Sequence, residues 1–274
     1  MRAFPLASLL LCALASRAAA NPHALPYTYP SESLSKGATE LELASDFTPV
    51  QVANPDKGPT AASTGLRFTE VFEFEYGITS RLELGLYLQF FNDPGNGVAG
   101  ALDGIKQRLR YRFAAPGEWP LDVAVYLELA EMSDEIELEA KLNFQRRFGL
   151  ATLMVNLWGE REFYLRGGGA WVLHPTGGIT YQIDPHLHVG VEAWMNAAYG
   201  DGATDPASLL NNSPHYYVGP TVLLMFGRMW WSAGVYARLD SFGESAPLSV
   251  GATNPNYAVQ YGPLWVRTML GVDL

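Results

Sequence analysis

The stretch Arg81-Leu-Glu-Leu-Gly-Leu-Tyr-Leu-Gln-Phe90 decides the fold class of this 274-residue chain. Apolar residues occupy every second position, so the leucines and Phe90 share one face, and Arg81, Glu83 and Gln89 share the other. A repeat of two residues is the period of a β-strand. The stretch therefore predicts a strand with one apolar face and one polar face.

The same alternation returns along most of the chain. The clearest strands are predicted at 81–90, 105–113, 121–129, 136–145, 151–158, 187–195, 215–226, 229–240 and 264–274. No charged residue falls on the apolar face of these strands. Three further segments, 39–49, 66–76 and 171–183, alternate less regularly, because Glu70 and Pro175 interrupt two of them. The pattern as a whole predicts twelve strands.

The predicted connections alternate between short and long. The short ones are 77–80, 114–120, 146–149, 184–186 and 227–228, and the others are 50–65, 92–104, 131–134, 160–170, 197–213 and 241–262. Only 131–134 breaks the alternation. Short periplasmic turns and long extracellular loops are typical of outer-membrane barrels. The predicted fold is all-β: a single closed, antiparallel, up-and-down transmembrane barrel of about twelve strands over residues 37–274.

A soluble β-sandwich or lipocalin-like barrel would also alternate, with its apolar face inside. Two features favour a membrane. Twelve up-and-down strands exceed the eight of closed soluble barrels, and aromatic residues of the apolar face, such as Phe74 and Tyr76, gather near the short turns like an interfacial girdle. We therefore expect the apolar face to contact lipid. Finding Leu84, Val125 and Leu138 together in a protein interior would overturn this expectation.

The first twenty residues have the pattern of a secretory signal. Arg2 is followed by the apolar run 6–15 and by Ala18-Ala-Ala20, which offers a small-residue cleavage site. Cleavage after Ala20 removes the only cysteine, Cys12, and leaves Asn21 first. Residues 21–36 are expected to form a periplasmic N-terminal segment. The predicted location is the bacterial outer membrane of a Gram-negative cell, with its lipid as partner.

Charge and motifs exclude several function classes. The formal net charge of −10 gives no support for binding nucleic acid. No phosphate loop, cysteine cluster or nucleophilic-serine elbow appears, and His186-x-His188 fits a surface turn better than a metal pair. We expect no catalytic, cofactor-binding or metal-binding residues. The chain is predicted to be a non-enzymatic barrel, with a monomer favoured.

The polar face of segment 105–113 carries four basic residues. A hairpin centred on residue 117 would place Arg112 opposite Asp122, Arg108 opposite Tyr126 and Lys106 opposite Glu128. The next hairpin would bring Glu128 near Glu137, and Tyr126 near Glu139. The predicted lumen or constriction residues are Lys106, Arg108, Arg110, Arg112, Asp122, Tyr126, Glu128, Glu137, Glu139 and Lys141.

Two interpretations of these charges remain open. The first is a pore constriction. In it, the basic row of 106, 108, 110 and 112 lies beside an acidic strip of Glu128, Glu137 and Glu139, and the transverse field between them orders charged or dipolar solutes. Alternatively, a narrow lumen needs ion pairs to satisfy its buried charges. Twelve strands permit either an open or a plugged bore, and the plug could come from loops or from residues 21–36. The lumen-facing Trp158, Trp194, Trp230 and Trp265 could stack on an aromatic or sugar substrate, or simply fill space.

The stretch Phe72-Glu-Phe-Glu-Tyr-Gly-Ile-Thr-Ser-Arg-Leu-Glu-Leu-Gly-Leu-Tyr-Leu88 resembles the second hairpin of bacterial outer-membrane barrels. With segments 102–113, 137–142 and 188–193, it resembles the MetA-pathway-of-phenol-degradation barrel family. The resemblance implies a transport-related function and transfers no site residue. The predicted function is a narrow channel that passes small solutes of unknown identity by passive diffusion. The alternative is a non-conducting structural or surface-interaction barrel whose lumen is filled by ion pairs.

Overall fold

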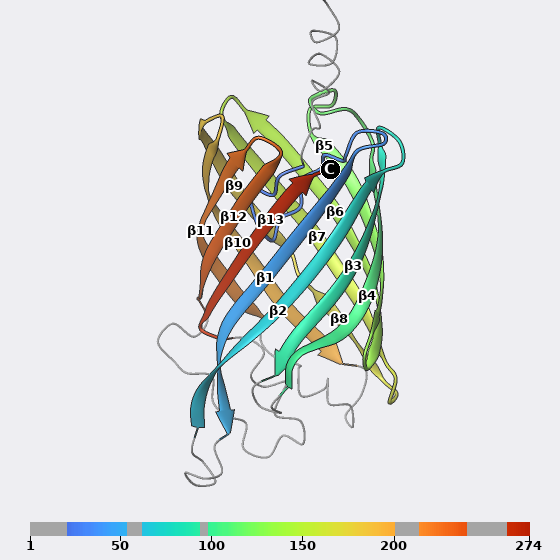
Figure 1. Ribbon diagram of the computed structural model, residues 1–274, viewed down its shortest axis with the longest axis vertical. Helices are drawn as coiled ribbons and strands as arrows, with labels where there is room; N and C mark the ends of the chain where they lie inside the picture. Colours follow the sequence, from blue (N-terminus) through green and yellow to red (C-terminus); the bar gives the residue numbers. More distant parts are fainter. Residues whose placement is uncertain (1–20, 54–61, 94–97, 201–213, 240–261) are drawn as a thin grey trace, which may run out of the picture.

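The computed structural model describes residues 21–53, 62–93, 98–200, 214–239 and 262–274 (Figure 1). The strands are β1 (Thr39–Ala53), β2 (Ala62–Gly77), β3 (Leu82–Asp93), β4 (Val98–Arg112), β5 (Asp122–Met132), β6 (Glu135–Phe148), β7 (Ala151–Tyr164), β8 (Gly169–Leu173), β9 (Thr176–Asp184), β10 (Leu187–Gly200), β11 (His215–Phe226), β12 (Met229–Arg238) and β13 (Leu264–Asp273). Within these residues, no helix is long and apolar enough to cross a membrane.

The strands form one closed antiparallel barrel. The last strand, β13, pairs with β1 from Glu40–Asp273 to Phe47–Val266, which removes the free edges of the sheet. Strands β8 and β9 both pair with β7 and with β10, so together they occupy one position in the wall. The break between them lies at His174 and Pro175, because proline has no N–H for the ladder. The barrel therefore has twelve positions, and the predicted fold is confirmed.

The connections differ at the two ends of the barrel. The end at the top of Figure 1, which we call the short-turn end, carries the turns 78–81, 149–150, 185–186 and 227–228 and the loop 113–121. Gly149 and Gly227 permit two of the two-residue turns because their φ values of 62° and 68° lie in the left-handed region. At the opposite, long-loop end, the longest intervals between the described strands are those from β10 to β11 and from β12 to β13.

Three predicted long loops are much shorter than expected. Residues 50–53 and 62–65 are strand, and so is most of 92–104 and of 160–170. The reason is that β1 continues to Ala53, β2 begins at Ala62, β4 begins at Val98 and β7 continues to Tyr164. The expectation was wrong here for a physical reason. A strand that continues beyond the hydrocarbon layer no longer needs apolar residues on its outer face, so the hydropathy pattern ends before the hydrogen-bonded ladder does.

The two faces of the wall are opposite in character to those of a soluble barrel. Large aliphatic side chains such as Leu127 (54% exposed) and Leu138 (49% exposed) lie on the outside, whereas Arg108, Arg110 and Glu83 are fully buried inside. Leu84 and Val125 are half-buried on the same outer face. The apolar face therefore points away from the interior, as a barrel surrounded by lipid requires.

Candidate functional site

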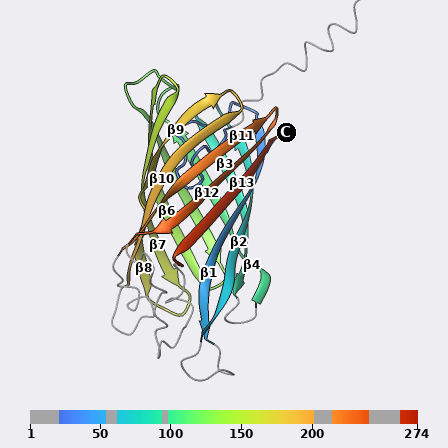
Figure 2. The ribbon, with the colours of Figure 1, turned by 90° about the vertical axis from the view of Figure 1, so that its left-hand side faces the viewer.

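Residues 21–36, which we call the plug segment, lie inside the barrel. Figures 1 and 2 show its blue chain within the ring of strands at the short-turn end. His23 and Leu25 are completely buried, and Leu34 is 1% exposed. The sequence led us to expect a periplasmic N-terminal segment and left open whether it plugs the barrel; the structure places it in the lumen at the short-turn end. The aromatic and aliphatic residues of the segment need burial. Its prolines at 22, 26 and 30 prevent the segment from forming a central strand of the wall.

The plug segment descends into the lumen and returns to the same end. The Asn21 side chain donates to the carbonyl oxygen of Glu32 at 3.5 Å, so the two arms lie close together. At the end of the returning arm, the Gly37 N–H donates to the Gly77 carbonyl at 2.7 Å, beside the β2–β3 turn. Tyr27 reaches deepest, where its hydroxyl donates to Asp46. The segment therefore occupies the lumen without passing through to the long-loop end.

Side chains of the wall satisfy the backbone of the plug segment. The Asn156 amide accepts from the Tyr29 N–H at 2.6 Å and donates to the Tyr29 carbonyl at 2.9 Å. Glu192 accepts from the Tyr27 N–H at 3.0 Å and from the Thr28 hydroxyl at 2.7 Å. A buried irregular segment must find such partners, because unpaired peptide groups are costly in an interior. The wall therefore contains fitted acceptors and donors for this segment.

Aromatic rings fill the remaining space around the plug segment. Trp194 stacks on Tyr217 at 3.9 Å between centroids, and Trp158 stacks on His174 at 4.2 Å. Trp230 stacks on His23 of the plug segment at 5.7 Å. The Trp265 indole N–H donates to Asp46 at 2.9 Å. All four lumen tryptophans thus contact protein groups, which favours their space-filling interpretation over substrate stacking.

All ten predicted lumen residues belong to the polar register of the wall. Eight of them are less than 10% exposed: Arg108, Arg110, Asp122, Tyr126, Glu128, Glu137, Glu139 and Lys141. Lys106 is partly exposed, with 17% of its side chain accessible. Arg112 lies near the short-turn end, where its guanidinium donates to the Ser80 carbonyl. Their role as a pore constriction stays a prediction.

The predicted pairing of these residues was wrong by two positions. Arg108 faces Glu128 and Arg110 faces Tyr126 across β4 and β5, while Glu128 faces Glu139 across β5 and β6. Both hairpins are centred one residue later than expected, and the β5–β6 turn consists of residues 133–134 alone. An even shift leaves every side chain on its predicted face, so the lumen assignment stands although the partners change.

The two central arginines pair with a different set of carboxylates from the one expected. The Arg108 guanidinium lies 2.7 Å from Glu73 and 2.9 Å from Glu83, and also contacts Glu75. Arg110 lies 2.6 Å from Glu83. These acceptors belong to β2 and β3, not to the acidic strip of β5 and β6.

Gly85 makes room for this arginine cluster. An added Cβ at Gly85 would lie 2.5 Å from Arg108 Nε. The absence of a side chain at this position therefore allows the guanidinium to lie flat against β3. The predicted lumen residues did not include Glu73, although it alternates with the outward Phe72 and Phe74 on its strand.

Lysines neutralise part of the acidic strip instead. Lys106 Nζ lies 3.5 Å from Glu128 and 3.4 Å from Glu137. Lys141 Nζ lies 2.7 Å from Glu139 and 3.7 Å from the centroid of the Trp158 ring. Such a cation–π contact stabilises an ammonium that has left water.

The acidic strip extends further than the sequence suggested. On β7, Glu160 pairs with Glu139 and Glu162 pairs with Glu137. Both new carboxylates are half-buried. The predicted loop at 160–170 leaves them out, although Trp158, Glu160 and Glu162 continue the inward alternation. We call the five carboxylates the acidic wall: Glu128, Glu137, Glu139, Glu160 and Glu162.

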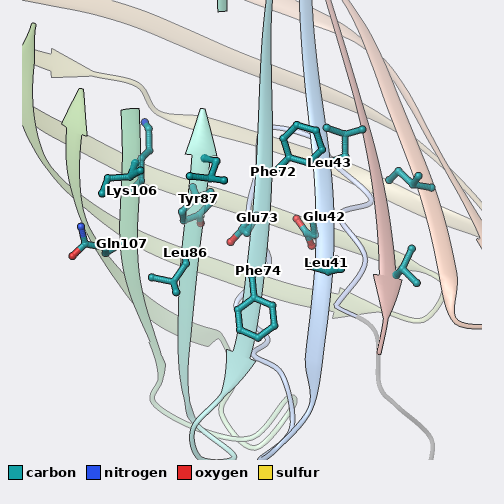
Figure 3. A pocket seen from close by; sticks show the side chains of 14 residues that line it. Leu41, Glu42, Leu43, Phe72, Glu73, Phe74, Leu86, Tyr87, Lys106 and Gln107 are labelled. Carbon is teal, nitrogen blue, oxygen red and sulfur yellow. The ribbon is translucent and has the colours of Figure 1, made fainter. Parts of the chain in front are cut away.

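Among the residues that the structure describes, the outer wall offers no comparable site. A hollow of about 760 Å³ lies at β1–β4 and β13 and is open to the outside. Its outward lining is mostly apolar, and Figure 3 shows Phe72, Phe74 and Leu86 among the residues around it. A bilayer contacts such a surface without specific recognition, so the lumen is the candidate functional site.

Comparisons with known proteins identify the fold. No family model matches the chain, and no curated protein matches it, so membership in the MetA-pathway barrels stays a prediction. An outer membrane channel from Pseudomonas putida F1 has a similar structure, with a TM-score of 0.55 and 11% identity over 89% of this chain and 98% of that one. The NanC porin also has a TM-score of 0.55, with 10% identity over 85% of this chain and all of that one. The chain thus has the fold of bacterial outer-membrane barrels.

Proposed function

We propose that this protein is a channel of the bacterial outer membrane that its own plug segment holds closed at the short-turn end. The observation that carries the proposal is the plug segment in the lumen, bound through its backbone by Asn156 and Glu192. Side chains alone fill a barrel of eight strands, whereas wider barrels leave space. In this twelve-position wall, the plug segment fills space that would otherwise hold water.

The geometry favours a plug that can leave the lumen over a permanent filling. Both arms of the plug segment lie at one end, so the segment can withdraw without unpairing any strand. The two similar barrels are a channel and a porin, which supports the same class of function here. Passage would be passive diffusion of small solutes through a monomer, after removal of residues 1–20 during export.

The acidic wall gives the open state a preference for cations. Five carboxylates face two lysines in this region, Lys106 and Lys141. Excess carboxylates along a passage raise the local concentration of cations and exclude anions. We infer that small cationic or neutral polar solutes pass more readily than anions.

A non-conducting barrel is the second candidate. The fully buried cluster of Arg108 and Arg110 with three glutamates favours it, because these charges are paired among themselves and leave none for a solute. In this case the barrel would act through its surface or its loops. The two candidates differ in what happens when the plug segment is absent.

Conductance in planar bilayers tests the proposal. The full chain should open rarely, and a variant lacking residues 22–36 should show larger and more persistent openings with cation preference. Retained heat-modifiable mobility in SDS gels would show that the deletion variant still forms a barrel. Glu160→Gln with Glu162→Gln should lower the cation preference of the open barrel, whereas Glu118→Gln in the 113–121 loop should leave it unchanged. A folded deletion variant that never conducts would establish the non-conducting alternative.

A further inference from the structure

Three buried carboxylates converge where the plug segment begins. Glu40 and Glu42 of β1 and Glu75 of β2 each place an oxygen within 4.8 Å of the other two. Glu40 and Glu75 are completely buried, and Glu42 is 4% exposed. Carboxylates this close, and removed from water, need positive charge or donors nearby.

The cations of the wall do not serve this whole cluster. Arg108 and Arg110 contact Glu75, but within the described residues no lysine or arginine forms an ion pair with Glu40 or Glu42. Glu40 accepts from the Trp230 indole N–H. His23 Nε2 lies 3.7 Å from Glu42, and both Glu42 oxygens lack a hydrogen-bond partner in the described structure. Neither Glu40 nor Glu42 therefore has a permanently charged counter-ion among the described residues.

The backbone nitrogen of Asn21 points at this cluster. It donates to Glu40 Oε2 at 3.2 Å, and Asn21 is only 4% exposed. The same nitrogen belongs to the peptide bond after Ala20, where the small-residue pattern predicts cleavage. Hydrolysis of that bond by a signal peptidase consumes one water molecule. The carboxylate departs with Ala20, and the nitrogen of Asn21 becomes a primary amine that takes up a proton.

We propose that removal of residues 1–20 creates a buried α-ammonium on Asn21 that serves as the counter-ion of Glu40 and its neighbours and fastens the plug segment to the wall. Before cleavage the nitrogen offers one donor and no charge. After cleavage it offers three donors and one positive charge at the same place, and charge-assisted hydrogen bonds to carboxylates are about twice as strong as neutral ones. Cleavage after Ala20 therefore supplies a counter-ion inside the lumen, in addition to removing residues 1–20.

This role does not depend on whether the barrel conducts. An ammonium that neutralises the cluster would fasten the plug segment equally in a channel and in a non-conducting barrel. The test therefore measures the amine itself, and the conductance of the deletion variant does not enter it.

Reactivity of the amine gives a direct test. The full chain is expressed with residues 1–20, extracted from the outer membrane and shown by intact mass to begin at Asn21. A succinimidyl ester at neutral pH is then applied to folded and urea-unfolded protein, and labelled peptides are quantified by mass spectrometry. The folded Asn21 amine should react at least about tenfold more slowly than the unfolded one, because the reagent reaches it only on local opening. Exposed Lys36 should react alike in both states.

Two variants separate the charge from simple burial. Glu40→Gln keeps the size and an acceptor oxygen but removes the charge, and should raise the labelling rate of Asn21 several-fold. The matched control is Glu118→Gln, whose parent side chain is 54% exposed, and it should change nothing. A refolded chain that retains Ala20 displaces the amine; it should label as fast as unfolded protein and melt at a lower temperature than the chain beginning at Asn21.

Three results would overturn the proposal. The first is a mature chain that begins elsewhere. The second is a folded Asn21 amine that labels as fast as Lys36. The third is an Ala20-retaining chain with the same melting temperature as the chain beginning at Asn21. This third comparison stays decisive even if Glu40→Gln fails to fold.

Discussion

Replacing Arg108 by methionine should strongly destabilise the barrel. Arg108 is completely buried and contacts Glu73 at 2.7 Å, Glu83 at 2.9 Å and also Glu75. Its removal leaves Glu75 and Glu83 to Arg110, and leaves Glu73 without an ion-pair partner among the described residues. Breaking a buried ion pair from one side costs about 3–5 kcal/mol, because the remaining charge has neither water nor a partner. We expect Arg108→Met to lower the free energy of unfolding by about 4 kcal/mol.

An exposed arginine provides the matched control. Arg81 lies 3.9 Å from Glu118, and the two side chains are 46% and 54% exposed. Exposed pairs of this kind contribute about 0–1 kcal/mol, so Arg81→Met should have little effect. The assay is urea unfolding in lipid vesicles, followed by tryptophan fluorescence and by heat-modifiable mobility in SDS gels.

A compensating substitution tests the cause of the loss. Adding Glu75→Gln to Arg108→Met removes one of the unpaired charges and should recover about half of the lost stability, as expected of residues in one network. If Arg108→Met costs no more than Arg81→Met, the buried cluster does not stabilise the barrel and the reasoning fails.

Two further predictions concern the plug segment and the outer face. Asn156→Ala leaves the Tyr29 N–H and carbonyl without partners, which costs about 1–3 kcal/mol for each buried group. Hydrogen exchange at the Tyr29 amide, measured by mass spectrometry, should therefore accelerate at least tenfold. Asn143→Ala loses one 3.4 Å contact to the Pro30 carbonyl and should have a smaller effect. Equal exchange in both variants would contradict the assigned contacts. Leu127→Arg places a charge on the outer face at a cost of about 2–4 kcal/mol near the bilayer midplane; an unchanged urea midpoint in vesicles would show that Leu127 does not face lipid.

The sequence predicted the wall well because lipid and lumen impose opposite demands on neighbouring residues. Each strand must alternate, so the face of Arg110 or Leu138 could be read directly. The break at Pro175 was also visible, because proline cannot continue the ladder. The register within a hairpin was less certain, because a shift of two residues preserves the same hydropathy pattern and only the turn decides between the alternatives.

The contents of the lumen could not be read in the same way. Apolar and polar residues do not alternate regularly along the plug segment. Nothing in its sequence therefore shows that Tyr29 contacts Asn156 on a strand more than a hundred residues away. Several strands carry inward glutamates, and hydropathy does not show which of them Arg108 contacts. Gly85 was the one local signal, since a small inward residue marks the place where a neighbouring long side chain can lie.

The pairing of β1 with β13 sets the order in which this protein can assemble. Glu40 near the start of the barrel has Asp273 as its cross-strand partner, so the first strand keeps an open row of peptide groups until the last strand arrives. Hydrocarbon tolerates no such row. A chain still being exported therefore cannot settle stably in the bilayer, and insertion must wait until β13 has been delivered.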